Sequence, residues 1–363
     1  MAETKIIIKK TLEYIYSTQD FSPGEYYGSF WSEKAYHGPL LDWHGGGSHH
    51  HRGAGSAALT MWLMAVEQNN VEMKYRAEQA FDWLVACQHE RGGWFEIQNN
   101  EKPSDWEKTG REELSTIETA FVIHGLGHAL LNGLPPKKIY MDCLEKAGYW
   151  FLELEWPSGS GIFPHHERSP YDTLNANAHS VESLSLIFSC LEIIYGKSIN
   201  IFLQGARRGF CHTLPLQWEN GCYPYRRDKG ITINYTSLVL WCFLNTLDIL
   251  PAKHLIDWPG KSTINEHFKK ATAFLCSCIN SDGSLDWETN ESSTAKHNIW
   301  TYAITINVLS RVGGKANCDS AKKLLKRLIS FKTASGLLPM KDHEEKITEC
   351  LFMQADIMLF LRY

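Results

Sequence analysis

The chain has 363 residues, of which 44% are hydrophobic, and a formal net charge of −5. This length and composition are those of a globular protein with a large core, and we expect residues 1–363 to form a single domain. The mildly acidic balance and the lack of a basic block argue against a nucleic-acid partner. The N-terminal apolar run is too short for a signal peptide and no later run could span a membrane, so we predict a cytoplasmic protein.

Cysteines are scattered along the chain without a Cys-x-x-Cys pair. Most lie in apolar helical patterns, where cysteine behaves as a small buried hydrophobic residue. We therefore expect reduced thiols in the core rather than a disulfide framework or a cysteine-based metal site.

Hydrophobic periodicity predicts helices of two types that alternate along the chain. The first type has one apolar face, which is typical of a helix on the outside of a domain. It covers residues 4–19, 71–88, 137–155, 199–216, 263–279 and 319–332. The second type is apolar on nearly all sides, which indicates complete burial. It covers residues 55–68, 115–131, 177–195, 234–250, 298–312 and 348–361. Strand-like residues occur only as short stretches within loops.

Six amphipathic helices, each followed by a buried one, predict an inner ring of helices inside an outer ring. This is the all-α (α/α)6 toroid; a two-layer solenoid fits the periods but gives no reason for so regular an alternation. Long segments join each outer helix to the next inner helix, whereas return connections such as 69–70 and 313–314 are short. The long loops must therefore emerge at one end of the ring, where we expect the function to lie.

One short frame recurs at intervals of roughly 55 to 70 residues, as expected of a repeat architecture. An aromatic and an apolar residue are followed by a glutamine, a short gap, a glycine and another aromatic residue. The clearest copy runs from Trp83 through Gln88 and Gly92 to Trp94. The other copies are centred on Gln19 with Gly24, Glu155 with Gly159 and Gly161, Gln217 with Gly221, Ile279 with Gly283, and Thr333 with Gly336.

This frame resembles the repeat of the terpenoid cyclases, and the whole pattern resembles the α/α toroid of terpenoid cyclases and protein prenyltransferases. The resemblance implies a scaffold, not an activity. The cyclases' Asp-x-Asp-Asp motif has no match, and Asp142 with Cys143 has the wrong spacing for the prenyltransferase zinc ligands. The double ring also resembles carbohydrate-acting toroids (polysaccharide lyases, sugar epimerases and glycosidases) and, more weakly, toroid proteins encoded with bacterial exopolysaccharide synthesis genes.

The first long loop is rich in glycine and histidine directly before a buried helix. Such glycine turns expose backbone N–H groups at the positive end of a helix, which suits a carboxylate, phosphate or sulfate. Candidate catalytic residues here are His49 and His51, and candidate substrate-binding residues are Asp42, Trp43 and Arg52. The competing interpretations are a flexible loop with solvated histidines and, less favoured, a zinc site, because adjacent histidines cannot all face one ion.

The third long loop carries a second dense cluster. Abstraction of a proton beside a carboxylate needs a histidine or tyrosine as the base, and an arginine or asparagine that neutralises the carboxylate. Candidate catalytic residues are His166, Tyr171 and His179, and candidate binding residues are Arg168 and Asn177. The competing interpretation is a polar loop held by its own hydrogen bonds.

The remaining loops place aromatic residues, which we expect to be exposed, next to charged ones. Such pairs suit stacking on sugar rings and bonding to sugar hydroxyl groups. The candidate binding residues are Glu113, Tyr225, Arg226, Tyr235, Trp287, His297 and Trp300. We expect Trp94, at the last position of the clearest repeat, to have a structural role. We expect His124 and His128 to be hydrogen-bonded core residues.

We therefore predict a carbohydrate-active enzyme of polysaccharide metabolism or biosynthesis that abstracts a proton from an acidic saccharide, as a lyase or an epimerase, without a cofactor. A divalent cation and the oligomeric state stay open. A glycoside hydrolase would instead draw two carboxylates from Asp42, Glu113, Glu167, Asp228, Asp286 and Glu288.

Two further functions are compatible with the same scaffold. One is a terpenoid cyclase or prenyl-transfer enzyme, against which the missing acidic motif counts. The second is a non-catalytic saccharide-binding protein of a polysaccharide-assembly system. Polar groups and histidines inside the ring would favour a sugar, whereas an apolar funnel would favour an isoprenoid.

Overall fold

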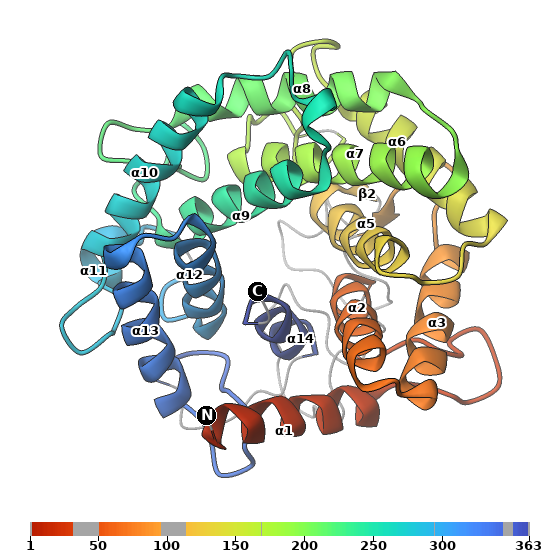
Figure 1. The fold of residues 1–363 in the computed structure, drawn as a ribbon, viewed down its shortest axis with the longest axis horizontal. Helices are drawn as coiled ribbons and strands as arrows, with labels where there is room; N and C mark the ends of the chain where they lie inside the picture. Colours follow the sequence, from red (N-terminus) through yellow and green to blue (C-terminus); the bar gives the residue numbers. More distant parts are fainter. Residues whose placement is uncertain are drawn as a thin grey trace.

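The computed structural model describes residues 2–31, 51–95, 114–167, 169–293, 295–343 and 351–361. Its long helices form two concentric rings (Figure 1). The outer ring consists of α1 (Ala2–Thr18), α3 (Val71–Ala86), α6 (Lys138–Leu154), α8 (Asn200–Thr213), α10 (Lys261–Ser277) and α13 (Lys315–Ser330). The inner ring consists of α2 (His51–Gln68), α5 (Thr116–Leu131), α7 (Leu174–Tyr195), α9 (Ile233–Ile249), α12 (Ile299–Val312) and α14 (Leu351–Phe360). The predicted (α/α)6 toroid is confirmed.

Burial explains why the helices separate into two rings. Inner helices such as α7 are buried on nearly every side, whereas outer helices such as α13 bury one apolar stripe and expose basic residues. Two inner helices begin earlier than predicted, because α2 starts at His51 and α7 at Leu174. Arg52 thereby belongs to the first turn of a helix and not to a loop. Residues 348–350 of the last predicted helix lie outside the described residues.

In the three copies that have a glutamine, its side chain ties one outer helix to the next. The Gln88 side chain donates to the carbonyl of its turn glycine, Gly92, at 2.8 Å and to the carbonyl of Cys143 in α6 at 2.9 Å. Gln19 and Gln217 make the same pair of bonds, to their own turn glycine and to the following outer helix. The frame is therefore a structural unit of the outer wall.

The turn glycine allows two outer helices to approach closely. Gly92 has a φ of +108°, and a Cβ at this position would collide with the carbonyl oxygen of Lys146 in α6. The corresponding glycine of the first copy is Gly28, whose carbonyl accepts from Gln19, and not the predicted Gly24. The gap between glutamine and glycine is longer in that copy, and the sequence spacing alone therefore misplaced the turn.

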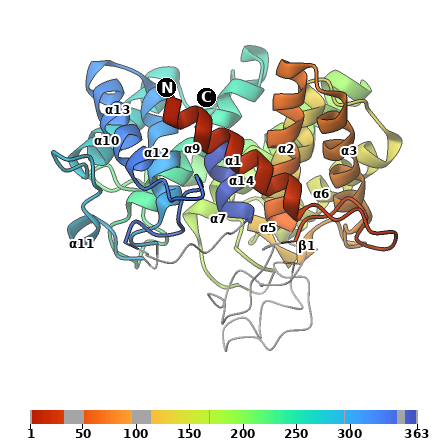
Figure 2. The same cartoon turned by 90° about the horizontal axis from the view of Figure 1, so that it is seen from below.

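The long connections lie at one end of the ring, as predicted, and the short ones at the other (Figure 2). We call these the loop end and the short end. Small elements at the loop end are the antiparallel pair β1 (Trp94–Phe95) and β2 (Leu114–Ser115), the helix α11 (Trp287–Asn290) and the 3-10 turn Leu214–Leu216. The 3-10 turn Ala252–His254 lies between α9 and α10. Among the described helices, none has the length and apolarity to cross a membrane.

Candidate functional site

Each inner helix contributes one side chain to a layer of residues around the ring axis. We call this set the axial layer: Arg52 of α2, Phe121 of α5, His179 of α7, Trp241 of α9, Trp300 of α12 and Phe360 of α14. The ring centroid of Phe121 lies 5.1 Å from that of His179 and 6.4 Å from that of Trp241. Phe360 lies 5.2 Å from Trp241 and 5.3 Å from Trp300. The six side chains thus form a connected cluster drawn from all six inner helices.

Arg52 contributes a positive charge to the axial layer and links Phe121 to Trp300. Its guanidinium carbon lies 4.2 Å from the centroid of the Phe121 ring and 5.9 Å from that of Trp300, so it rests between two aromatic faces. Its Nη2 donates to Asp356 at 2.9 Å, and its backbone N–H donates to Glu118 at 2.9 Å. A partly buried arginine held in this way has a fixed position, which suits recognition of an anion.

Asp356 is the fully buried partner of Arg52. Its carboxylate also accepts from the Ser56 hydroxyl, and from the indole N–H of Trp300 at 3.0 Å. Burial raises the pKa of Asp356 above its ordinary value, although Arg52 opposes this change. The carboxyl group therefore ionises less readily than an exposed aspartate, and three side chains, Arg52, Ser56 and Trp300, hold it in place.

The ends of the inner helices add to the positive potential near Arg52. All six inner helices direct their N-termini to the loop end, where each helix dipole places about half a positive charge. Local caps keep the helices regular: Ser115 accepts from the Glu118 backbone, and Thr232 from the Tyr235 backbone. These N-termini therefore add positive potential at the loop end of the axis.

His179 is the predicted catalytic residue that lies in the axial layer. Its Nδ1 lies 3.5 Å from the Cys242 sulfur, and its buried Nε2 has no hydrogen-bond partner among the described residues. Burial lowers the pKa of His179 to about 3, with the nearby positive charge of Arg52 acting in the same direction. The imidazole is consequently neutral at neutral pH, and one of its nitrogens is available as an acceptor.

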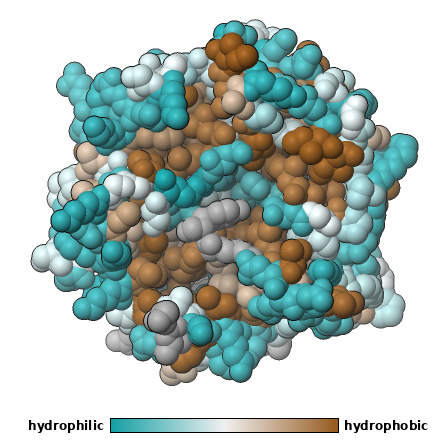
Figure 3. Space-filling model, in the orientation of Figure 1, coloured by the Kyte–Doolittle hydropathy of each residue, from teal (hydrophilic) through white to brown (hydrophobic). Residues whose placement is uncertain are grey.

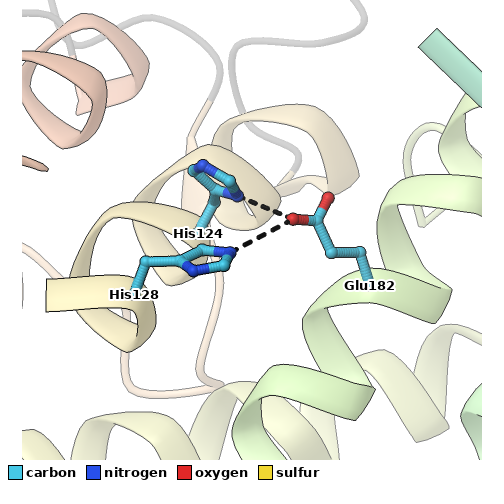
Figure 4. Close-up of side chains that lie close together, drawn as sticks. All are labelled: His124, His128 and Glu182. Atoms are coloured by element: carbon cyan, nitrogen blue, oxygen red, sulfur yellow. Dashed lines mark hydrogen bonds and ion pairs between the residues drawn. The ribbon is translucent and has the colours of Figure 1, made fainter. Parts of the chain in front are cut away.

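A second polar cluster adjoins the axial layer toward the short end, with its Glu182 carboxylate within 4.8 Å of the His179 nitrogen and the Cys242 sulfur. His124 of α5 stacks 4.7 Å from the Trp241 ring, and its Nδ1 lies 2.7 Å from Oε1 of Glu182 in α7. His128, one turn further along α5, points its Nε2 at the same oxygen from 3.7 Å (Figure 4). Asn245 of α9 donates to that oxygen at 2.8 Å. We call His124, His128 and Glu182 the short-end cluster.

Several predicted site residues have structural contacts away from the axis. His51 lies between α2 and α3, where its ring stacks on Trp83 of the outer ring. The Asn177 side chain accepts from the Phe163 backbone and donates to Asp172, so it anchors the third loop. His166 is half-buried, and its Nε2 lies 2.7 Å from the Nδ1 of the neighbouring His165.

The tryptophans predicted to be exposed at the loops are buried, which corrects the expected surface stacking. The indole N–H of Trp287 donates to Asp342, and that of Trp300 donates to Asp356. His297 also bonds to Asp342, at 2.8 Å. A buried carboxylate attracts these N–H groups inward, since an unpaired one would be costly there.

The remaining candidates form a separate group at the edge of the loop end. Tyr171 is 52% exposed and lies under the guanidinium of Arg226, 3.9 Å from its ring centroid. Arg226 also forms an ion pair with the exposed Asp228. Tyr225 and Tyr235 are half-buried and contact each other, with ring centroids 4.7 Å apart. The predicted residues Asp42, Trp43, His49, Glu113 and Arg168 lie outside the described residues.

The predicted hydrolase carboxylates that the structure describes bond to separate partners. Glu167 bonds to Arg91 and Trp150, Asp286 caps α11, and Glu288 pairs with Lys296 at the surface. The buried carboxylates of the inner helices are instead Glu118, Glu182 and Asp356, none of which was a candidate site residue. Each is an isolated acid within an otherwise apolar inner helix, and this signal could have identified them.

Comparison with known proteins identifies similar folds. No family model and no curated sequence matches the chain. A solved D-mannose isomerase superposes with a TM-score of 0.69 at 14% identity, covering 98% of this chain and 95% of that one. The cellobiose 2-epimerase of Bacillus thermoamylovorans gives 0.65 at 11% identity, covering 99% and 100%. An unsaturated glucuronyl hydrolase specific for heparin gives 0.64 at 12% identity, covering 99% and 96%. These similarities show the toroid fold, and they do not extend the resemblance to terpenoid cyclases.

Proposed function

We propose that the chain is a carbohydrate-active enzyme that binds an acidic saccharide at the axial layer and transfers a proton, as an epimerase or a lyase. The observation that carries this proposal is the position of Arg52 and His179, which both contact the ring of Phe121. An anion-binding group and a neutral proton acceptor thereby lie within one small region of the ring axis.

Arg52 would receive the carboxylate of the substrate. The ion pair with Asp356 and the backbone bond to Glu118 fix its position, and the six helix N-termini add positive potential. When a proton leaves the carbon beside a carboxylate or carbonyl group, negative charge develops on the substrate oxygens. A fixed arginine stabilises that charge because it needs no rearrangement during the reaction.

His179 would accept the proton. If Cys242 receives a hydrogen bond from Nδ1–H, the lone pair of His179 is on Nε2, which is the nitrogen without a partner among the described residues. The bound negative charge of a substrate would raise the pKa of His179 and so make it a stronger base. Return of a proton to the opposite face gives an epimer, and expulsion of a β-substituent gives a lyase product.

Tyr235, which is half-buried and lies within electrostatic range of Arg52, would contact the sugar ring beside the axial layer. The similar folds support the saccharide as substrate, because D-mannose isomerase and cellobiose 2-epimerase are named for sugars. Location in the cytoplasm and a role in polysaccharide metabolism stay predictions.

A ligand panel tests this proposal. Thermal shifts would be measured with uronic-acid oligosaccharides, neutral oligosaccharides and prenyl diphosphates, for the wild type, Arg52→Lys and Arg226→Lys. Arg226 is the matched control, because it also lies over an aromatic ring but belongs to the edge of the loop end. We expect stabilisation by the acidic sugars that Arg52→Lys weakens and Arg226→Lys preserves.

Different outcomes of the panel would reject the proposal. Stabilisation by prenyl diphosphates alone would return the chain to the terpenoid cyclase interpretation. Release of reducing ends without an unsaturated product would identify a hydrolase. Binding of acidic sugars with no turnover of any panel member would indicate a saccharide-binding protein.

A further inference from the structure

The short-end cluster has the ligand set of a transition-metal site. His124 and His128 are four residues apart on α5 and so lie on one face of the helix, and Glu182 faces them from α7. One nitrogen of each histidine and one carboxylate oxygen lie within 4.8 Å of one another. Figure 4 shows both histidines directed at the same oxygen of Glu182. We propose that His124, His128 and Glu182 bind a single Zn²⁺ ion.

An unmatched polar atom provides an independent reason for a ligand at this place. Nε2 of His128 is buried and has no hydrogen-bond partner among the described residues, since 3.7 Å from Glu182 is too long for one. A buried nitrogen without a partner costs free energy, which coordination of a metal ion would recover. Nε2 of His128 points at the same Glu182 oxygen that Nδ1 of His124 contacts. A metal ion between these three atoms would coordinate all of them.

Residues around the cluster would hold the ligands in place. Asn245 donates to Glu182 at 2.8 Å, and Arg311 donates to the Asn245 oxygen at 2.6 Å. Hydrogen bonds of this kind orient the ligands of metal sites. Arg311 also forms an ion pair with Asp248 at 2.8 Å, which offsets its repulsion of a cation.

The number of ligands indicates an open site. Two histidines and one glutamate leave the fourth tetrahedral position of zinc for water or a small ligand. The His128 side chain is 12% exposed, and the short face of the ring is hollowed around the axis with apolar residues inside (Figure 3). Zinc could therefore reach the cluster from the short end, which is the end opposite to the proposed sugar site.

Metal binding to the full chain tests the site independently of any enzymatic activity. After treatment with EDTA, the protein would be titrated with Zn²⁺ by calorimetry and with Co²⁺ by visible absorption. We expect one equivalent of metal, the absorption of tetrahedral Co²⁺, and a dissociation constant that rises about tenfold or more in His128→Ala. His128→Ala leaves the His124–Glu182 bond intact, so this variant should still fold.

His254→Ala is the matched control, because His254 also pairs with a glutamate, Glu192, but lies outside the ring axis. It should bind Zn²⁺ as the wild type does. Equal loss of binding in both variants, or no difference between the wild type and His128→Ala, would overturn the proposal. A thiolate-to-Co²⁺ band would also overturn this ligand set and assign the metal to Cys242, which lies near Glu182 together with His179.

Discussion

Gln88 and Gln217 lie two outer helices apart, yet each bonds to its own turn glycine and to the next outer helix. The axial layer has no such equivalence, because the six inner helices contribute an arginine, a histidine, two tryptophans and two phenylalanines. The outer wall is thus built from one interaction used repeatedly, and the axis from different residues at related positions. The difference separates a wall that repeats one structural interaction from an axis where we propose that the function lies.

The largest effect should come from the charge at the axis. Arg52→Ala should reduce the free energy of unfolding by about 3 to 5 kcal/mol, because it leaves the buried Asp356 without its ionic partner. Urea denaturation would measure this change. Arg226→Ala, which removes an ion pair with an exposed aspartate, should cost less than about 0.5 kcal/mol. Equal costs would mean that the Arg52–Asp356 ion pair at the axis contributes no more stability than an ion pair at the surface.

A pair of glycines tests the close contact in the outer wall. Gly92 and Gly133 both have positive φ, but only a Cβ at Gly92 would collide with a neighbouring backbone. We expect Gly92→Ala to cost about 3 kcal/mol and Gly133→Ala about 1 kcal/mol, both by chemical denaturation. Similar values would show that backbone conformation, and not the approach of α6, determines the need for glycine.

The equivalence of the repeats can be measured directly. Gln88→Ala and Gln217→Ala each remove two bonds to backbone carbonyls, so each should cost about 2 kcal/mol, and Gln217→Ala also removes the bond of Gln217 Oε1 to His267 at 2.9 Å. The two losses in denaturation free energy should therefore agree within about 1 kcal/mol, which is the net contribution of one hydrogen bond. A large difference would contradict the description of the wall as one repeated unit.

The smallest effect is expected where the repeat uses a charge instead of an amide. Glu155 replaces glutamine in the third copy, and it accepts from the Gly161 backbone and from Arg208. Burial would raise the pKa of Glu155, but the hydrogen bonds from Arg208 and Gly161 lower it overall. Its stabilisation is therefore complete above its ordinary pKa of 4.5 and is lost as the pH falls.

The test of this effect is the pH dependence of stability for Glu155→Gln. Between pH 6 and pH 3, the wild type should lose about 1 kcal/mol more than the variant, because glutamine cannot take up a proton. Identical pH profiles would show that the Glu155–Arg208 pair contributes no stability through its ionisation.

The fold was predictable because its signals are periodic. Alternating burial along the chain gave both rings, and Gln88 with Gly92 gave the repeat, although the turn of the first copy was placed at Gly24 instead of Gly28. The axial layer was not predictable to the same degree. Arg52 and His179 were among the candidates, but Phe121 and Trp241 read as ordinary core residues, since position around a helix does not reveal which side faces the axis.

An isolated acidic residue within an apolar helix is a sequence signal for a buried polar cluster, and it was not among the features used to choose the candidate residues. Glu182 and Asp356 are buried and hydrogen-bonded, and both organise the groups around them. A buried acid is rarely kept without a partner. The edge residues Tyr171 and Arg226 attracted attention because they are close in sequence to other polar residues, but their contacts are with each other.

The most direct test of the account is hydrogen exchange catalysed at the axis. Proton NMR in D₂O would follow uronic-acid saccharides with the wild type, His179→Gln and the control His212→Gln, whose histidine pairs with Asp172 outside the axial layer. The account predicts loss of one substrate C–H signal with the wild type and the control, and a rate at least about a hundredfold lower with His179→Gln. Exchange that persists in His179→Gln, or no exchange of any acidic sugar by the wild type, would contradict proton transfer at this layer.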